Sequence, residues 1–204
     1  DAAIPESRGV TEGILHEFFS LGMLTANGAP HERRRSIMSR ALSTVLAKEL
    51  RASVRNATED LIDAVYAQGT AEFVSQFADK IPVLALAGIL GVSKEERAVF
   101  VSHVGELSRF FSPTSTTADV AKSAEAAAFL RDYLMRKMAQ SHTGAGFMDA
   151  IKEAAEDAGV SAVEAAIQII QLIIGGNESV RAAIVAQTSL LLLHKSQWNA
   201  VCED

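Results

Sequence analysis

Cysteine and positive charge are both scarce in this sequence. Cys202 is its single cysteine, so no internal disulfide can form, which excludes a disulfide-stapled scaffold and favours a reducing, cytoplasmic compartment. The chain has 19 Lys and Arg against 25 Asp and Glu, a formal net charge of −6. A chain of this charge is not expected to bind nucleic acid.

Helix breakers and strand patterns are also rare. Only 4 Pro and 13 Gly interrupt 204 residues that are 49% hydrophobic, and no run of alternating polar and apolar residues is long enough to build a substantial sheet. The length suffices for a real core, and no linker divides the chain. We therefore expect a single, mainly α domain over residues 1–204, with at most minor β structure.

The spacing of apolar residues and of helix start and stop signals predicts individual elements. A short strand is expected at 71–74 and a loop at 112–117. Capping boxes are expected at Ser93 with Glu96 and at Ser161 with Glu164. The predicted helical segments are 11–20, 30–42, 43 or 44 to 68, 77–90 interrupted at Pro82, 93–111, 118–140, 147–158 and 161–195.

The last predicted helix is long and apolar on most sides, which is typical of a central, buried helix. Its apolar stretch, Ile167 to Leu193, contains Glu178 and Arg181 near the middle. Spanning a bilayer would place both charges in hydrocarbon, so no membrane span is expected.

A pair of glycines interrupts this helix. Each costs about 1 kcal/mol relative to Ala in a helix interior, and we expect a distortion there. The helical period places small residues on one stripe, which would accept either a flat cofactor or a closely packed partner helix. Glu178 favours the cofactor, because a carboxylate in an apolar setting needs a partner or a raised pKa. The stripe comprises Gly175, Gly176, Ser179, Ala182, Ala183 and Ala186.

A basic stretch opens the predicted helix at 30–42. On a helix, His31 and Arg35 share one face with buried Met38 and Leu42, while the opposite face carries outward arginines. Two donors one turn apart suit a buried carboxylate or phosphate. The alternative is a solvated basic face that neutralises an acidic neighbour.

Together, in this order and about 140 residues apart, these two stretches resemble the cytochrome P450 family. The run from His31 to Arg35, leading into Ser39-Arg40-Ala41-Leu42, resembles the family's C helix. Gly175-Gly176-Asn177-Glu178-Ser179 resembles its I helix. The segments 81–92 and 191–198 resemble its E helix and the start of its J helix, and the similarity covers essentially the whole chain, in the manner of the soluble bacterial members.

The resemblance implies a helical P450-like fold with a long central I-type helix, and an enzyme that inserts one oxygen atom of O2 into a small hydrophobic organic substrate. It implies heme b as the cofactor and a ferredoxin-type redox partner. His31 and Arg35 would hold the haem propionates, Gly175 and Gly176 would leave room for dioxygen, and Glu178 and Ser179 would deliver protons.

Further roles follow from the same resemblance. The loop at Met23 and Leu24 and the pair Phe110 and Phe111 would lie around the substrate channel, although ordinary core is the alternative for the two phenylalanines. Arg33 and Arg40 would meet the acidic redox partner.

The sequence also departs from the family. Ser179 replaces the usual Thr, and Arg34 replaces a common apolar residue, so its stem is expected to pack while its head reaches solvent or an anion. The family's K helix and haem-ligand cysteine loop have no counterpart, because Cys202 lies in a different context. We therefore interpret the chain as a partial P450-like domain without the axial ligand and inactive alone; the alternative is a truncated, non-catalytic helical binding or interaction protein.

Overall fold

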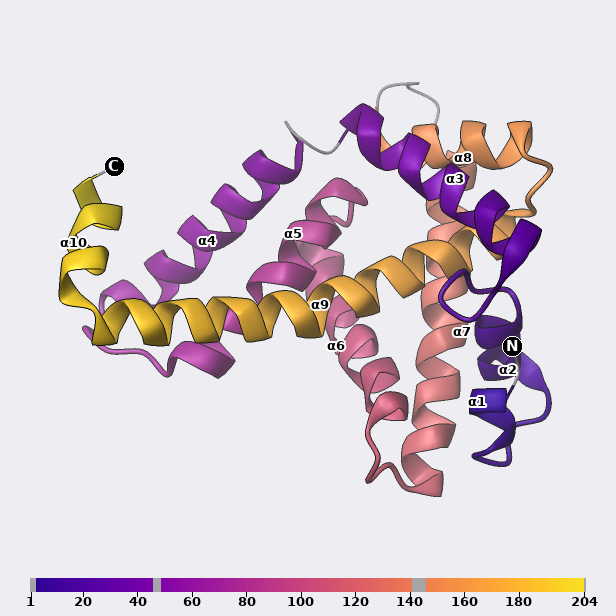
Figure 1. Ribbon diagram of the computed structural model, residues 1–204, viewed down its shortest axis with the longest axis horizontal. Coiled ribbons are helices and arrows are strands. Elements are labelled where there is room, and N and C mark those ends of the chain that lie inside the picture. The colour runs from indigo at the N-terminus through magenta and orange to yellow at the C-terminus, as the bar shows by residue number, and fades with distance from the viewer. Residues whose placement is uncertain (1–2, 46–48, 141–145, 204) are drawn as a thin grey trace.

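The computed structural model describes residues 3–45, 49–140 and 146–203, and every regular element within those ranges is a helix (Figure 1). This confirms the mainly α fold. The elements are α1 (Ala3–Glu6), α2 (Gly13–Ser20), α3 (Gly28–Val45), α4 (Arg51–Tyr66), the π-helix η2 (Val74–Ala78), α5 (Ile81–Ile89), α6 (Lys94–Ser108), the 3-10 helix η3 (Arg109–Phe111), α7 (Thr117–Gln140), α8 (Phe147–Asp157), α9 (Ala162–Leu193) and α10 (Lys195–Glu203).

The core forms around the first half of α9, which contacts α3, α5, α6, α7 and α8. Residues 164–171 of this helix are all buried, as is Ile173. Large aromatic and aliphatic side chains from the surrounding helices, such as Phe100 and Phe147, complete the same cluster. Half of the expected central helix is therefore central and buried.

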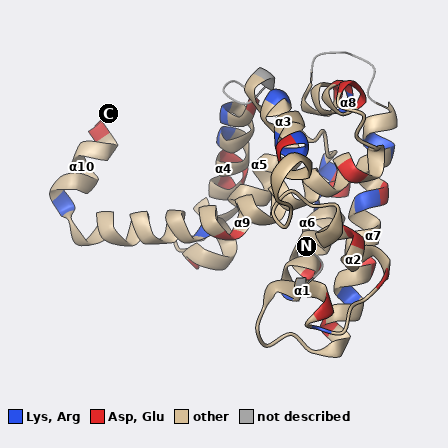
Figure 2. Cartoon of the chain, turned by 45° about the vertical axis from the view of Figure 1, so that its right-hand side comes forward, with Lys and Arg blue, Asp and Glu red and all other residues tan. Residues whose placement is uncertain are grey.

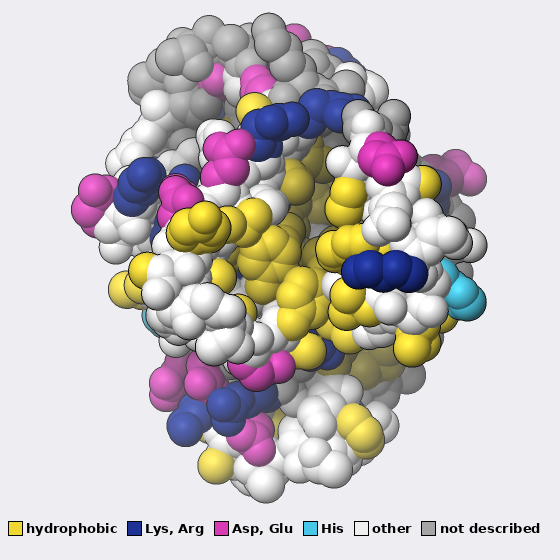
Figure 3. Space-filling view, turned by 90° about the vertical axis from the view of Figure 1, so that its left-hand side faces the viewer, with side chains coloured by type: hydrophobic (Ala, Val, Ile, Leu, Met, Phe, Trp, Pro, Cys, Tyr) yellow, Lys and Arg dark blue, Asp and Glu magenta, His cyan; other side chains and the backbone are white. Residues whose placement is uncertain are grey.

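The second half of α9 differs from this expectation. It projects from the helical body toward α10 (Figure 1), and no side chain in the described range 174–203 is buried. Residues 182–194 carry no Lys, Arg, Asp or Glu, so the projecting half is almost free of charge (Figure 2). Seen from that end, hydrophobic side chains surround a hollow (Figure 3). The helix runs unbroken through Gly175 and Gly176, so the glycine pair does not interrupt it.

By length and composition alone, α9 could cross a membrane, and it is the one helix in the described ranges that passes this test. Its first half, however, is enclosed by other helices, as in the core helix of a water-soluble fold. Length and apolar composition therefore do not by themselves identify it as a membrane span.

Local signals account for most helix boundaries. Ser93 and Glu96 form the complete predicted capping box, while the Ser161 hydroxyl accepts a bond from the Glu164 amide. Pro82 stands in the first turn of α5, where its missing N–H is tolerated. Gly91 follows that helix with a φ of 66°, which only glycine adopts without strain.

The predicted strand at 71–74 is wrong. Ala71 and Glu72 belong to no regular element and are exposed, and Val74 already begins the π-helix. The Glu72 carboxylate accepts hydrogen bonds from the amides of Val74 and Ser75, so it caps the start of a helical turn. The hydrogen bonds to Glu72 favour a helical turn at this position more than the short apolar run favours a strand.

Candidate functional site

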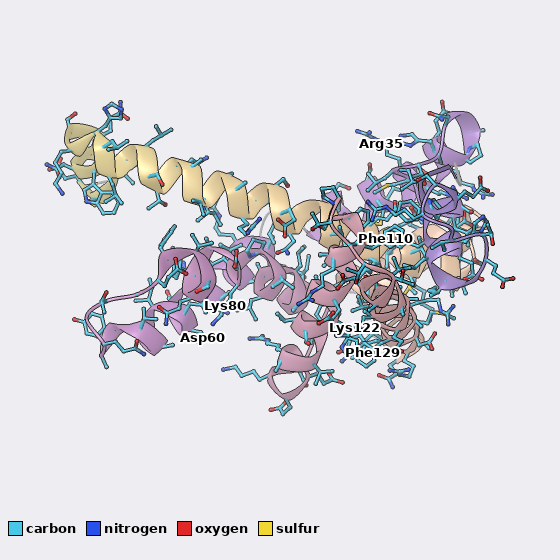
Figure 4. All side chains as sticks on the ribbon, turned by 90° about the horizontal axis from the view of Figure 1, so that it is seen from below. Arg35, Asp60, Lys80, Phe110, Lys122 and Phe129 are labelled. Atoms are coloured by element: carbon cyan, nitrogen blue, oxygen red, sulfur yellow. The ribbon has the colours of Figure 1, made fainter. Side chains whose placement is uncertain are left out.

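The basic stretch lies on α3, and its buried face differs from the predicted one. Arg34, Ile37, Met38 and Ala41 face the core, whereas Arg35 is exposed. Figure 4 shows Arg35 pointing away from the helical body. The buried stripe is rotated by about one residue because Arg34 finds a partner inside the protein. The guanidinium of Arg35 is thereby left available to an external anion.

His31 is half-buried one turn before Arg35. Its Nδ1 lies 2.9 Å from the backbone carbonyl of Met23. A carbonyl can only accept, so this nitrogen carries the proton and donates. The ring is therefore fixed by the loop that precedes α3, and its other nitrogen is not engaged by this bond.

Arg34 forms an ion pair with Glu164 of α9. Its Nε lies 2.6 Å from Oε1 of Glu164, and the side chains are only 8% and 10% exposed. Nη1 of Arg34 donates to the carbonyls of Ser20 and Gly22. The head of Arg34 thus reaches an anion inside the protein, and the Glu164 carboxylate serves this pair in place of the predicted capping box.

Two buried glutamines continue the polar contact between α9 and residues 18–24. Gln168 accepts from the Met23 amide (2.8 Å) and donates to the Leu21 carbonyl (2.7 Å). Gln171 accepts from the Leu24 amide (3.1 Å) and donates to the Phe18 carbonyl (3.1 Å). We call Arg34, Glu164, Gln168 and Gln171 the loop clamp. It satisfies backbone groups that would otherwise be buried without partners.

Gly22 shows how closely the loop approaches α9. A Cβ added at Gly22 would lie 1.6 Å from Nε2 of Gln171 and 2.7 Å from the Phe18 carbonyl oxygen. Only glycine fits there without displacement. The loop clamp was missed by the sequence analysis, although a signal exists: Glu164, Gln168 and Gln171 follow an i, i+4, i+7 spacing, a polar stripe within an apolar helix.

The glycine pair on α9 is not required by packing within the described chain. A Cβ added at Gly175 would meet nothing within 4 Å, and one at Gly176 would make an ordinary 3.5 Å contact with Leu86. Every other member of the small-residue stripe is exposed. Ser179 donates its hydroxyl to the Gly175 carbonyl at 2.7 Å. The stripe is therefore a smooth, open surface whose hydroxyl oxygen can still accept a hydrogen bond.

Glu178 lies on the surface with a cationic partner. Its side chain is 56% exposed, and Oε2 lies 2.5 Å from Nη2 of Arg181, which also reaches Asp79 at 3.3 Å. The charge of Glu178 raises the pKa of the Arg181 guanidinium further above its ordinary value. The apolar setting expected for this carboxylate is not present, and its need for a partner is met by Arg181.

The predicted channel residues divide between core and surface. Phe110 is 1% exposed and belongs to the core, whereas Phe111 is 43% exposed. Phe111 lines a hollow of about 440 Å³ together with Asn177 and Glu178. Leu24 is 66% exposed, and Met23 is fixed by the loop clamp. Phe111 is thus the member of the aromatic pair that borders the same hollow as Glu178, one of the two candidate proton-delivery residues.

The outward arginines have acidic partners inside the chain. Arg33 contacts Glu164 at 3.4 Å, and Arg40 pairs with Asp157 at 3.0 Å. Both remain about half exposed, so they still form a basic spot on α3 (Figure 2). Among the residues that the structure describes, no three His, Cys, Asp or Glu side chains gather to hold a metal ion, and Cys202 is exposed on α10.

Comparison with known proteins finds relatives that match nearly the whole chain. No family model matches the chain. It is 29% identical over 198 residues to the plant-inducible cytochrome P450-pinF1 of Rhizobium radiobacter, which covers 96% of this chain and 47% of that protein. It is 24% identical over 206 residues to 6-deoxyerythronolide B hydroxylase of Saccharopolyspora erythraea, covering 100% and 50%. The chain spans about half the length of the curated relatives it matches.

Solved structures show the same fold. CalO2 superposes with a TM-score of 0.84 at 21% identity, covering 98% of this chain and 51% of that one. Epothilone B-bound cytochrome P450epoK superposes with a TM-score of 0.81 at 20% identity, covering 100% and 54%. The curated relatives match the chain over nearly its whole length and the solved structures have the same helical arrangement, so the chain is similar to cytochromes P450 in sequence and in fold.

Proposed function

We propose that the whole protein is a cytoplasmic, haem-dependent monooxygenase that inserts one oxygen atom of O2 into a small hydrophobic organic substrate, with electrons from a ferredoxin-type partner. Relatives whose names state such an activity, including the Steroid C26-monooxygenase of Mycobacterium tuberculosis at 24% identity, support the reaction class. They do not identify the substrate, because each name describes its own protein.

The observation that carries the proposal is the open stripe on the projecting half of α9. Gly175 would accept a methyl group without any contact, yet each glycine costs about 1 kcal/mol in a helix interior. Leu190, Leu192 and Leu193, farther along the same helix, are 57%, 60% and 78% exposed. Apolar surface of this kind calls for a covering group, and a flat cofactor together with the remainder of a full-length chain would provide one.

The residues of α3 and α9 fit haem. The exposed guanidinium of Arg35 and the free ring nitrogen of His31 suit carboxylates such as propionates. Gly175 and Gly176 leave the surface of α9 without side chains, so that a flat group and dioxygen can approach the helix closely. When bound, haem would supply the activation of O2, with a cysteine thiolate as its ligand. We do not assign that thiolate to Cys202.

In this proposal Ser179 and Glu178 handle protons. The Ser179 hydroxyl already donates to Gly175, and its oxygen keeps lone pairs that can order a water molecule. Glu178 borders the hollow beside Phe111 and is paired with Arg181. To carry a proton it must exchange this partner for water, which its 56% exposure allows.

The test is to express the whole protein and measure haem content and the absorbance of the ferrous carbon monoxide complex. We expect one haem per chain and the red-shifted band of thiolate ligation, both unaffected by Cys202→Ala. Replacing His31 and Arg35 with Ala should lower haem retention, whereas Arg40→Ala, at the other end of α3, should leave it unchanged. A whole protein without haem, or one that loses the red-shifted band in Cys202→Ala, would contradict the proposal.

A further inference from the structure

A second hollow, of about 320 Å³, lies between α4, α5 and α6, and its wall contains groups of both charges. Arg97 comes from α6, and Glu49 comes from the residues just before α4. Neither side chain forms an ion pair with the other or with any further residue that the structure describes. Small-molecule sites have volumes of about 300–1,000 Å³, so the hollow is large enough for a small ligand.

Arg97 is a partly enclosed cation whose guanidinium has no partner within the described ranges. Its Nε is shielded from solvent and makes no hydrogen bond. The other arginines that are not fully exposed all have a hydrogen bond or an ion pair, namely Arg8, Arg34, Arg131 and Arg181. A guanidinium does not lose its charge in a protein, and a charge that is partly withdrawn from water needs a partner. Arg97 is therefore suited to an anionic group from outside the chain.

Polar groups also line the hollow where α4 and α5 approach each other closely. A Cβ added at Gly88 would lie 1.9 Å from Oγ of Ser53, so the contact between the two helices requires glycine. The Ser53 hydroxyl donates to the Ala85 carbonyl at 2.7 Å, and its oxygen can still accept a hydrogen bond. Asn56, one turn farther along α4, is exposed and offers an amide that both donates and accepts. The wall can therefore bind donors as well as acceptors.

Helix α5 separates this hollow from the small-residue stripe of α9. Leu86 lies on the face of α5 toward α9, because a Cβ added at Gly176 would be 3.5 Å from its Cδ1. Leu84 and Gly88, two positions before and after Leu86, line the hollow from the other side of the helix. No described residue of α9 belongs to the wall. The hollow is thus distinct from the surface to which we assign haem.

We propose that the hollow between α4, α5 and α6 binds a small zwitterion, such as a free aliphatic α-amino acid. The carboxylate of the ligand accepts hydrogen bonds from the terminal N–H groups of Arg97, since Nε is enclosed. Its ammonium group donates to the carboxylate of Glu49. A simple anion would leave Glu49 unpaired, and a simple amine would leave Arg97 unpaired. Leu84 and Ile89 give the wall an apolar part that suits an aliphatic side chain.

L-Leucine and two analogues that each lack one of its charged groups test the proposal on the whole protein as purified. The first analogue, 4-methylpentanoate, has no amine, and the second, 3-methylbutylamine, has no carboxylate. Equilibrium dialysis measures the affinity of each compound. We expect both analogues to bind at least about tenfold more weakly than leucine, because each loses one charge-assisted contact. An analogue that binds as tightly as leucine, or inorganic phosphate that binds more tightly, overturns the proposal of a zwitterion.

Substitutions assign each charged contact to its residue. Arg97→Gln should weaken leucine binding by about tenfold or more and leave the binding of 3-methylbutylamine unchanged. Glu49→Gln should remove the preference for leucine over 4-methylpentanoate. Arg51→Gln is the matched control, because Arg51 is an exposed arginine of α4 outside the wall of the hollow, and it should change neither affinity. Glu49 is also exposed, so the result for Glu49→Gln decides the question even if Arg97→Gln folds poorly.

The absorbance of bound haem distinguishes this hollow from the proposed haem site. Leucine should leave the spectrum unchanged, and Arg97→Gln should leave haem content unchanged, because α5 lies between the two sites. A spectral change with leucine that persists in Arg97→Gln would place leucine beside haem and overturn the proposal. No binding of leucine at millimolar concentration, or equal binding in the Arg97 and Glu49 variants and the unsubstituted protein, also overturns it. A whole protein without haem contradicts the proposed function, while the dialysis still tests this hollow.

Discussion

Breaking the Arg34–Glu164 pair should destabilise the protein far more than breaking a surface pair on the same helix. The two side chains are 8% and 10% exposed, with 2.6 Å between Nε and Oε1. Removing one partner of a buried pair leaves an uncompensated charge, at a cost of about 3–5 kcal/mol. In Arg34→Leu, Arg33 still lies 3.4 Å from the carboxylate, so we expect about 3 kcal/mol, the lower end.

The double variant separates the pair from its surroundings. Glu164→Leu also strands a charge and should cost about 3 kcal/mol, but Arg34→Leu with Glu164→Leu strands none, and an apolar replacement is often near neutral. We therefore expect the double variant to lose at least about 2 kcal/mol less than the sum of the single losses. Urea unfolding of the cofactor-free whole protein, followed by circular dichroism, measures each value.

Arg40 and Asp157 provide the matched cycle. Their atoms are 3.0 Å apart, comparable with the buried pair, but the side chains are 56% and 57% exposed. Exposed pairs contribute about 0.2–1 kcal/mol, so the coupling energy should be correspondingly small. If both cycles gave the same small coupling, burial would not govern the Arg34–Glu164 pair and our account of the loop clamp would be refuted.

Three further outcomes are expected of the whole protein. Glu178→Gln and Ser179→Ala should each lower product formation by about 10²-fold or less, and the amount of peroxide released per electron consumed should rise. If neither variant releases more peroxide and Glu178→Gln only has a lower melting temperature, Glu178 serves only to pair with Arg181. Gly175→Ala should stabilise the cofactor-free protein by up to about 1 kcal/mol, measured as a higher melting temperature, and should reduce haem content or turnover. Unchanged turnover would argue against a close approach of haem or dioxygen to α9 at this position. Hydrogen bonding by Tyr133, with smaller contributions from Ser93 and Lys137, lowers the pKa of Glu96 below its ordinary 4.5, so its stabilising effect is present above about pH 4.5 and is lost as the pH falls through the lowered value. Glu96→Gln should therefore lower the melting temperature near neutral pH but not in strong acid, and an equal loss at both would contradict this.

Sequence patterns predicted those parts of the fold that depend on nearby residues. The capping box at Ser93 and the glycine after α5 act over three or four positions, and both were confirmed, whereas Pro82, expected to interrupt a segment over 77–90, stands in the first turn of α5. The prediction of a strand at 71–74 was wrong because Glu72, inside this segment, caps a helical turn with its carboxylate. The apolar residues on which the prediction was based carry no information about that cap. The existence of these helices could thus be predicted from the sequence, while the conformation of the four-residue segment 71–74 could not.

The candidate site was less predictable, because its geometry depends on partners far apart in sequence. Arg34 was expected to send its head toward solvent or an anion, but nothing near it in the sequence identifies Glu164, 130 residues away. With Arg34 turned inward, Arg35 had to turn outward. Likewise α9 continues without a break through Gly175, which the glycine content alone does not reveal. The haem roles of His31, Arg35, Gly175 and Gly176 and the proton roles of Glu178 and Ser179 stay predictions.

The loop clamp also has a consequence for the order of events during synthesis. Its bonds join residues 145, 147 and 153 positions apart. At 5–20 residues per second, residues 18–24 are synthesised roughly 7–30 s before Gln168 and Gln171. Until then the loop can bond only to water, so α2 and α3 cannot reach their final burial. The ring of His31 should acquire its fixed orientation late, after α9 has been made.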